Sequence, residues 1–505
     1  MARRGRLRGR AAQAPDGARF RNIVNTTPPV EPFSADAVEA MHGAALTILR
    51  DLGIRVLGDA VRAVFAAAGA SVDDDHMVRM DPGLVKEALA SAPQEFTIRA
   101  RNPARDMQVD GRTIHFAAGG GCPNVTDRVR GRRPGTLAAF RDALRLQQSF
   151  DVCALLAPAV EPQDVDVRLR HLDMALDQAR LSDKVPFLYA RGTAQAEDGF
   201  ELLACAHGTD RATFETEPRC FTVINTNSPR QIDVPMGEGI IDFARAGQVS
   251  VITPFCLQGA MAPVALAGAL TLSHAEALAG IVLAQLVRPG APVVYGAFSS
   301  NVDLKSGAPV FGSPEHMRAN HGAGQLARHI GLPWRSGAGT VANMADGQAM
   351  AQTTLALMGT VQGGANLVFH AAGWLEGGLT FGFEKFIADL DVLHALALSM
   401  TPDSGTQVEL GLEDIAAVPP GGHFFDAPGT MERYATAFHE PLLFSSDNFG
   451  QWEENGCRTA EERATTVWQG ILADFEAPPI ADDRLEAMEA FVERRRAEGG
   501  AAISE

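Results

Sequence analysis

The fold class is set by three consecutive segments: VSVIT at residues 249–253, AEALAGIVLAQLV at residues 275–287 and PVVYG at residues 292–296. The first and third are short runs rich in β-branched residues, which is typical of buried strands, and the second is long enough for a helix. A strand, a helix and a second strand in this order are typical of a parallel sheet, in which the helix crosses over one face.

The same alternation recurs along most of the chain. Short apolar runs predict eight strands, at Thr113–Ala117, Val152–Leu156, Pro186–Ala190, Cys220–Ile224, Val249–Thr253, Pro292–Gly296, Pro333–Gly337 and Asn366–His370. Helical patterns follow them, at Leu137–Ser149, Val165–Arg180, Gln195–His207, Met236–Ala246, Ala275–Val287, Pro314–Ile330, Gly347–Val361 and Glu384–Leu398. Eight alternations favour an α/β fold, a closed (β/α)8 barrel of the TIM type. An open doubly wound sheet is the alternative, but no G-x-G-x-x-G motif opens a helix after the first strand.

The regions outside the alternation predict two extensions to the barrel. Residues 1–35 are predicted to be a disordered lead-in, and residues 36–110 a helical N-terminal unit. The catalytic barrel then takes residues 111–404. Residues 405–505, with a charged amphipathic helix at Asp482–Arg496, are predicted to be a C-terminal extension packed on the barrel.

Composition limits the classes of function. The chain has 505 residues, 46% of them hydrophobic, which is enough for a large buried core, and a formal net charge of −17, which disfavours nucleic acid as a partner. The six Cys form no C-x-x-C pair, so we expect no disulfide framework, no zinc site and a reducing cytoplasm. Five Arg among the first ten residues, with no apolar stretch after them, predict a solvated tail and no secretory signal. The uncharged run at 254–275 contains Pro, Gln and His, and we interpret it as a loop and a packed helix and not as a membrane span.

In a (β/α) barrel the functional site lies at the carboxyl ends of the strands. Those positions here carry aromatic, amide and acidic side chains, among them Tyr295, His370, Trp374 and Glu376. No Lys stands at a strand end for a Schiff base, no Ser stands in a nucleophile elbow, and no His/Cys cluster has ligand spacing, so we expect no metal bound by this chain. Aromatic faces with one acidic group suit a cation that has no hydrogen to donate, such as a quaternary ammonium.

Several motifs resemble those of the trimethylamine methyltransferase family. They are Thr253-Pro-Phe255 with Gly259-Ala-Met-Ala-Pro263, Tyr295-Gly-Ala-Phe-Ser-Ser-Asn-Val-Asp303 with Lys305-Ser-Gly-Ala-Pro309, His370-Ala-Ala-Gly-Trp-Leu-Glu-Gly-Gly-Leu379 with Phe383-Glu-Lys-Phe386, Gly421-Gly-His-Phe424 and Trp452-Glu-Glu454. The resemblance runs from about residue 35 to the C-terminus. It implies a (β/α) barrel that moves a methyl group from a methylated amine to the cobalt of a corrinoid (cobalamin), which a separate small corrinoid-binding protein carries.

The loop after the seventh strand separates the branches of this family. Members from methanogens that use trimethylamine carry pyrrolysine there, whereas Gly339–Gln348 holds ordinary residues. The chain therefore resembles the branch without pyrrolysine, which includes enzymes acting on glycine betaine and related quaternary amines. Since a quaternary ammonium leaves as a neutral amine, such an enzyme needs only to desolvate the cation and to aim one methyl group at the nucleophilic Co(I).

We hypothesise that Glu376 and His370 are the catalytic residues, and that Glu376 holds the ammonium together with the rings of Tyr295, Trp374 and Phe381. The side chains that orient the substrate and meet the docked corrinoid are then His370, Asn225, Gln258, Asn301 and Asn343. The motivation is their common position after the predicted strands.

Three points stay open at the level of sequence. Arg335, in the seventh predicted strand, is a candidate ligand for a betaine carboxylate. A barrel lyase or aldolase is an alternative function, which the missing strand-end Lys and metal cluster disfavour, and a non-catalytic sensor for a betaine-like ligand is another. Large barrels often pair, so we also expect a homo-oligomer.

Overall fold

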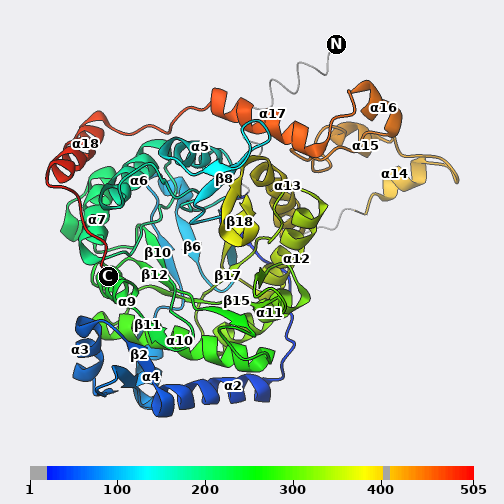
Figure 1. Ribbon diagram of the computed structural model, residues 1–505. Helices are drawn as coiled ribbons and strands as arrows, with labels where there is room; N and C mark the ends of the chain where they lie inside the picture. The colour runs from blue at the N-terminus through cyan, green and yellow to red at the C-terminus, as the bar shows by residue number, and fades with distance from the viewer. Residues whose placement is uncertain (1–19, 402–409, 505) are drawn as a thin grey trace.

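The computed structural model describes residues 20–401 and 410–504, so the predicted Arg-rich tail lies outside the described residues. Its centre is a curled seven-stranded sheet (Figure 1) with the order β1-β7-β18-β17-β14-β12-β10. All pairs are parallel except that of β1 (Ile23–Val24) with β7. The parallel strands are β7 (Thr113–Ala118), β10 (Phe221–Ile224), β12 (Val249–Ile252), β14 (Val293–Gly296), β17 (Trp334–Gly337) and β18 (Leu367–Ala372). Six of the eight predicted strands are thereby confirmed.

The other two predicted strands, Val152–Leu156 and Pro186–Ala190, do not form regular strands. They contribute isolated parallel bridges, Phe116↔Cys153, Leu155↔Val185 and Phe187↔Phe221. In the second segment Pro186 has no N–H to donate, which interrupts a continuous ladder. The sheet formed by the regular strands is strongly curled. This follows from the rings of Phe221 in β10 and Phe369 in β18, which lie 5.6 Å apart although three strands separate β10 from β18. These two rings therefore mark the inner face of the sheet.

A ring of long helices surrounds the sheet (Figure 1), and all eight predicted helices are confirmed within a few residues, apart from an earlier start of the fifth. Local capping explains several starts: Asp233 and Asp346 accept hydrogen bonds from the first turns of α9 and α12, and Ser313 does so before the Pro at the start of α11. The eight are α5 (Leu137–Gln148), α6 (Val167–Leu181), α7 (Thr193–His207), α9 (Val234–Arg245), α10 (Leu266–Val287), α11 (Pro314–His329), α12 (Gly347–Gly363) and α13 (Phe383–Met400), with the short α8 (Arg211–Phe214) after α7.

Helix α10 is the element whose composition resembles a membrane span. It has 22 residues and is apolar enough by length and composition to cross a bilayer, but 78% of its most apolar window is buried inside the protein. It packs between the sheet and the neighbouring helices α2 (Ala35–Thr47), α4 (Pro82–Ser91), α9 and α11. Packing inside the protein accounts for the apolar composition of α10 without a membrane, so we interpret α10 as a core helix.

The N-terminal region is not purely helical. Besides α2 (Ala35–Thr47), a π-helical turn at Ile48–Leu52, α3 (Asp59–Ala67) and α4 (Pro82–Ser91), it contains the short strands β2 (Ile54–Val56), β3 (Ser71–Val72), β4 (Met77–Arg79), β5 (Phe96–Ile98) and β6 (Met107–Val109). Strand β2 pairs with β11 (Gln231–Ile232), which lies in the loop after β10. Part of the predicted lead-in also packs on the body, since Phe20 is only 3% exposed and β1 joins β7.

The C-terminal region contains α14 (Leu412–Ala417), α15 (Pro428–Arg433), α16 (Phe449–Glu454), α17 (Ala460–Ala473) and α18 (Asp482–Ala497). Helix α17 packs on α13 and α5, and α18 packs on α6 and α7. By contrast, α14, α15 and α16 contain no buried residue. The extension therefore packs on the helical ring through its last two helices.

Candidate active site

Two small sheets hold the loops that follow the parallel strands. β13 (Phe255–Gln258) runs parallel to β15 (Phe298–Val302), which also pairs with β16 (Pro309–Val310). β19 (Trp374–Leu375) pairs with β20 (Thr380–Gly382), which lies beside β8 (Asn124–Thr126) and, through it, β9 (Arg133–Pro134). We call the face formed by these loops the mouth of the sheet. Hydrogen-bonded strands therefore position many of the side chains there.

A cluster of aromatic rings lies at the mouth. The ring of Phe298 stacks on that of Phe311 with centroids 5.0 Å apart, and the Trp374 ring lies 5.2 Å from Phe311 and 5.9 Å from Phe298. Phe255 joins the cluster at 5.4 Å from Phe298. The Nε1 donor of Trp374 is buried and has no hydrogen-bond partner among the described residues. The cluster thus combines ring faces with one unsatisfied donor.

Three glycines make room for the indole of Trp374. A Cβ atom at Gly119, Gly339 or Gly378 would meet indole atoms at overlapping distances. Gly339 and Gly378 also have φ of +104° and +106°, a backbone conformation that other residues rarely adopt. Glycines after the first, seventh and eighth predicted strands therefore fix where the indole lies.

His370 owes its orientation to a β-bulge. The register of β18 against β7 shifts between Val368 and Ala372, and φ of His370 is +59°. Its ring stacks on Trp374 with centroids 4.5 Å apart. The N–H of Gly120 donates to Nδ1 of His370 at 3.3 Å, and burial lowers the pKa of His370 well below its usual value. The ring is therefore neutral.

Arg335, from β17, lies on the inner face of the sheet beside this ring. It is only 2% exposed, and its guanidinium sits over the rings of Phe298 and Phe369, 5.2 and 4.8 Å from their centroids. Its Nη2 is 3.1 Å from Nε2 of His370, to which a guanidinium N–H can donate, while Nε and Nη1 have no partner among the described residues. Burial lowers the pKa of Arg335 to about 9, which still leaves it charged at neutral pH. These donors need an acceptor, and a carboxylate matches a guanidinium in shape and charge.

Glu376 is engaged by a second arginine. Nε of Arg132 donates to both carboxylate oxygens at 2.9 and 3.1 Å, and Nη2 donates to Oε2 at 3.0 Å. Partial burial disfavours the charged carboxylate, but the hydrogen bonds from Arg132 outweigh it and lower the pKa of Glu376. The side chain of Arg132 is 51% exposed, whereas that of Glu376 is 13% exposed. The acid is therefore ionised, and its partner reaches it from the solvent side.

Two of the predicted aromatic residues do not join the cluster. The hydroxyl of Tyr295 pairs with Nδ1 of His274 on α10 at 3.1 Å, and Tyr295 is opposite Trp334 in the register of β14 and β17, one residue before Arg335. Because side chains alternate along a strand, Tyr295 lies on the outer face of the sheet. The ring of Phe381 packs on Phe383 and Phe386 of α13. Phe381 is nevertheless opposite Trp374 in the register of β19 and β20. The structure therefore places Phe381 beside Trp374 on the neighbouring strand, whereas Tyr295 lies on the other face of the sheet.

The predicted amide residues lie at the mouth in two settings. Asn225 and Asn343 are exposed to solvent. Gln258 is buried and donates to the carbonyl of Ser300 at 3.3 Å, and Asn301 donates to the carbonyl of Val302 at 3.2 Å and accepts from Ser313 at 3.1 Å. The first pair is available to a docking molecule, whereas the second pair fixes β13 and β15.

The sequence-based hypothesis left out Phe298, Phe311 and Arg132. Phe298 stands in the motif that begins at Tyr295 and could have been included by its position after the sixth strand. Phe311 and Arg132 do not directly follow a predicted strand, so the sequence did not mark them. They reach the mouth from the loops that come after β15 and β8. Among the described residues, no group of three or more His, Cys, Asp or Glu is arranged to hold a metal ion.

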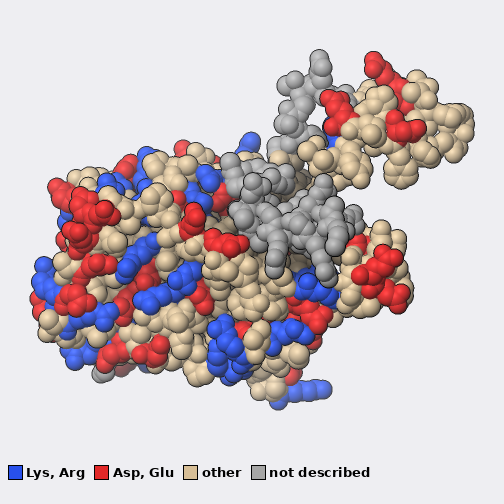
Figure 2. Space-filling view, turned by 90° about the horizontal axis from the view of Figure 1, so that it is seen from above, with Lys and Arg blue, Asp and Glu red and all other residues tan. Residues whose placement is uncertain are grey.

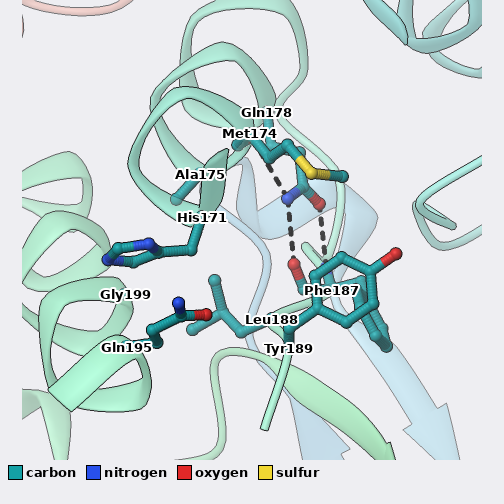
Figure 3. A pocket seen from close by; sticks show the side chains of 9 residues that line it. All are labelled: His171, Met174, Ala175, Gln178, Phe187, Leu188, Tyr189, Gln195 and Gly199. Carbon is teal, nitrogen blue, oxygen red and sulfur yellow. Dashed lines mark hydrogen bonds between the residues drawn. The ribbon is translucent and has the colours of Figure 1, made fainter. Parts of the chain in front are cut away.

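A hollow outside the sheet is separate from this site. It lies between α6, α7 and residues 187–189 (Figure 3), and its lining includes His171, Gln195 and Gly199. Gln178 closes one side by accepting from the N–H of Phe187 at 3.0 Å and donating to its carbonyl at 2.9 Å. None of the predicted site residues lines it.

Known proteins resemble the chain along nearly its whole length. Residues 1–500 match a protein family described as trimethylamine methyltransferase (MTTB). The chain is 33% identical over 471 residues to the glycine betaine methyltransferase of Desulfitobacterium hafniense (strain Y51), which covers 93% of this chain and 98% of that protein. It is 27% identical over 475 residues to the trimethylamine methyltransferase MttB of Desulfitobacterium hafniense (strain DSM 10664 / DCB-2), which covers 94% and 95%. Among solved structures, the hydroxylamine complex of MtmB aligns with a TM-score of 0.45 at 12% identity over 94% of this chain and 96% of that one.

Proposed function

Because the chain belongs to the trimethylamine methyltransferase family and is a methyltransferase, we propose that its methyl donor is a quaternary amine that also carries a carboxylate, as glycine betaine does. The proposed acceptor is the Co(I) corrinoid of a separate small corrinoid-binding protein. The family membership confirms what the motifs predicted, whereas the donor and the acceptor are the parts that an experiment must test.

The observation that carries this proposal is the unpartnered charge of Arg335. Three of its N–H directions, on Nε and Nη1, meet no acceptor in the described part of the chain, and its Nη2 lies 3.1 Å from Nε2 of His370. A substrate carboxylate would accept from Nε and Nη1 of Arg335 and would compensate the buried charge. Trimethylamine has no carboxylate and would leave these donors unsatisfied, so the arrangement favours a betaine as the donor.

The ring cluster supplies the second half of the proposed binding site. Trp374, Phe298 and Phe311 offer ring faces next to Arg335 and His370, and each ring in contact with a quaternary ammonium contributes about 0.5–2 kcal/mol. We keep Glu376 as the acidic group of this site. Its partner Arg132 is half exposed and is free to turn towards solvent when a cation approaches. His370 then holds Arg335 in position for the carboxylate, Phe381 supports Trp374 from the neighbouring strand, and Tyr295 has no role at the substrate.

The methyl transfer requires these side chains only to position the substrate. A corrinoid in the Co(I) state supplies the nucleophile that takes the methyl group, and the carbon–nitrogen bond breaks with its electron pair on a neutral tertiary amine. No proton moves in this step, so neither His370 nor Glu376 has to act as an acid or base. Their task is to exclude water from the ammonium group and to orient one methyl group out of the mouth, towards the attacking metal.

The rim of the mouth fits a docking protein. Exposed apolar side chains stand on five separate loops around it, namely Val129, Val264, Leu304, Met344 and Leu379. Such residues around a strand-end face are typical of an interaction site. Asn225, which is exposed on a further part of the rim, and Asn343, which is exposed next to Met344, are the proposed polar contacts to the corrinoid protein. Gln258 and Asn301 keep the rim strands in place.

We extend the proposal to the architecture around the site. The bridges at Phe116, Leu155 and Phe187 continue the parallel order from β7 to β10, which supports a closed (β/α)8 barrel. The boundaries at residues 35, 110 and 404 stay predictions, as do a cytoplasmic location and a homo-oligomeric state. An experimental structure with continuous ladders at 152–156 and 186–190 would support closure of the barrel.

The decisive experiment is a donor panel with free cob(I)alamin as acceptor. The wild-type protein is incubated with glycine betaine, other carboxylated quaternary amines, tetramethylammonium and trimethylamine, and the methyl–cobalt absorbance is followed. We expect turnover with a betaine and little with trimethylamine. Turnover with trimethylamine alone would refute the assignment of the donor, and tight binding of a betaine without any methyl transfer would favour a sensor.

A further inference from the structure

The C-terminal extension contains a segment that hardly packs on the rest of the chain. We call residues 410–441 the arm; they include α14 and α15, neither of which has a buried residue. The chain returns to the body just after the arm, where the N–H groups of Leu442, Leu443 and Phe444 donate to the Asp391 carboxylate at 2.6, 2.7 and 2.7 Å. The arm is therefore held at its base, while its helices stand apart.

The arm carries an unusual share of the exposed apolar surface. Of the 22 large hydrophobic side chains that are exposed in the described part of the chain, eight lie in these 32 residues. Phe438 is 92% exposed, Tyr434 82% and Phe425 79%. The others are Leu410, Leu412, Ile415, Phe424 and Met431. Figure 1 places α14 and α15 outside the ring of helices, and Figure 2 shows there a lobe that stands clear of the body, mostly uncharged.

The area involved is that of a stable interface. With about 150–250 Å² for a large side chain, the exposed parts of these eight residues sum to roughly 1,000 Å², whereas a standard interface buries about 800 Å² on each partner. Monomeric soluble proteins rarely leave a contiguous apolar patch of more than a few hundred Å² in water. The arm therefore needs a partner that stays in place.

The position of the arm separates this partner from the methyl acceptor. The arm follows α13, whose last residue, Met400, accepts a hydrogen bond from Thr26 at 2.6 Å, next to the strand β1 that pairs with the start of β7. This is the edge of the sheet opposite to the mouth. A protein that delivers a corrinoid must reach the mouth and leave after each turnover, so it would not cover the arm permanently.

We propose that the arm packs on a second copy of this chain, and that each copy of a two-fold symmetric pair covers the arm of the other. The Gly421-Gly-His-Phe424 motif, which the active site does not use, lies on this interface. Charge does not drive the association. The arm holds one Arg against five Asp and Glu, a net charge of 1 − 5 = −4, and the rest of the chain keeps −17 − (−4) = −13. The interface therefore forms between two acidic surfaces, and its affinity rises with salt.

Sedimentation equilibrium on the full chain tests the proposal. We expect the wild type to be a dimer at roughly 1 μM, with an affinity that rises between about 0.05 and 0.5 M NaCl. The double variant Phe425→Ser/Phe438→Ser raises the dissociation constant by about a hundredfold or more, since each substitution acts twice in a symmetric pair. Leu52→Ser, which removes a 53% exposed side chain far from the arm, is the matched control and leaves the mass unchanged.

Methyl transfer to free cob(I)alamin gives the second measurement. The double variant keeps the wild-type transfer rate, because both phenylalanines are exposed and lie away from the mouth. A monomeric wild type, or a double variant with the mass of the wild type, overturns the proposal. If the variant stays dimeric and loses transfer only to a corrinoid protein, the arm belongs to the acceptor instead. None of these outcomes depends on which amine is the donor.

Discussion

Replacing Arg335 by Met is the sharpest test of the proposed carboxylate site, because it moves stability and binding in opposite directions. Met has a similar length and no charge. Burial lowers the pKa of Arg335 from 12.5 to about 9, and at about 1.4 kcal/mol for a change of one in pKa this corresponds to roughly 5 kcal/mol against the buried charge. The contacts with Phe298 and Phe369 offset about 0.5–2 kcal/mol each. We therefore expect Arg335→Met to stabilise the ligand-free protein by about 1–4 kcal/mol.

The same substitution removes the proposed partner of the substrate carboxylate. Losing a buried, hydrogen-bonded charge pair costs about 2–5 kcal/mol, which is a loss of about 30- to 5,000-fold in kcat/KM for a betaine. Tetramethylammonium has no carboxylate, and its kcat/KM should change by less than about threefold. Cobalamin methylation followed by absorbance measures both donors, and denaturant unfolding measures stability. An equal loss with both donors, or a lower stability with unchanged kcat/KM for the betaine, would refute the reasoning.

Three further substitutions test other parts of the site and its support. Glu376→Gln should lower kcat/KM with free cob(I)alamin about tenfold or more, and an unchanged rate would remove Glu376 from the site. Because the pKa of Glu376 is lowered, its carboxylate stays charged above pH 4.5, and its contribution to binding is lost only as the pH falls through that lowered value. Gly339→Ala places a Cβ against the indole at a positive φ and should cost about 1–3 kcal/mol and most of the activity, whereas Gly347→Ala, which meets nothing within 4 Å, is the silent control. Nζ of Lys184 donates to three backbone carbonyls at 2.5 to 2.7 Å, and Lys184→Met leaves these carbonyls without a donor. The substitution should lower the free energy of unfolding by about 3–5 kcal/mol, whereas the protein that is still folded keeps its kcat/KM.

Most of the secondary structure could be predicted because it is encoded locally. Asp233 and Ser313 cap their helices next to a Pro in the first turn, and the Val-rich run at 249–253 is buried on both faces. The prediction was weaker where partners come from far away in the chain. Strand β2 is stabilised by pairing with β11, about 175 residues later in the chain. A strand of three residues is too short to show an alternation of apolar and polar residues, so the sequence does not predict it.

The candidate site shows the same division. His370 and Trp374 could be proposed from their motif, and the structure places their rings in a stack. Tyr295 stands in an equally specific motif but faces α10, because strand alternation assigns neighbouring residues to opposite faces and the motif does not reveal which face is inside. Phe311 reaches the cluster from the far end of a loop, and only tertiary folding brings it there.

The amino-acid sequence by itself determined the family and the alternation of strands and helices, and it predicted the end of the sheet at which to look for the site. These depend on residue type and on spacing over a few turns or strands, which a single segment already contains. Only the tertiary structure decided that Arg335 is buried beside His370 with Nε and Nη1 unpartnered among the described residues, that Arg132 pairs with Glu376, and that the arm stands apart. The physical reason is that burial, pairing and exposure are properties of what surrounds a side chain, and those surroundings come from segments that are distant in the sequence.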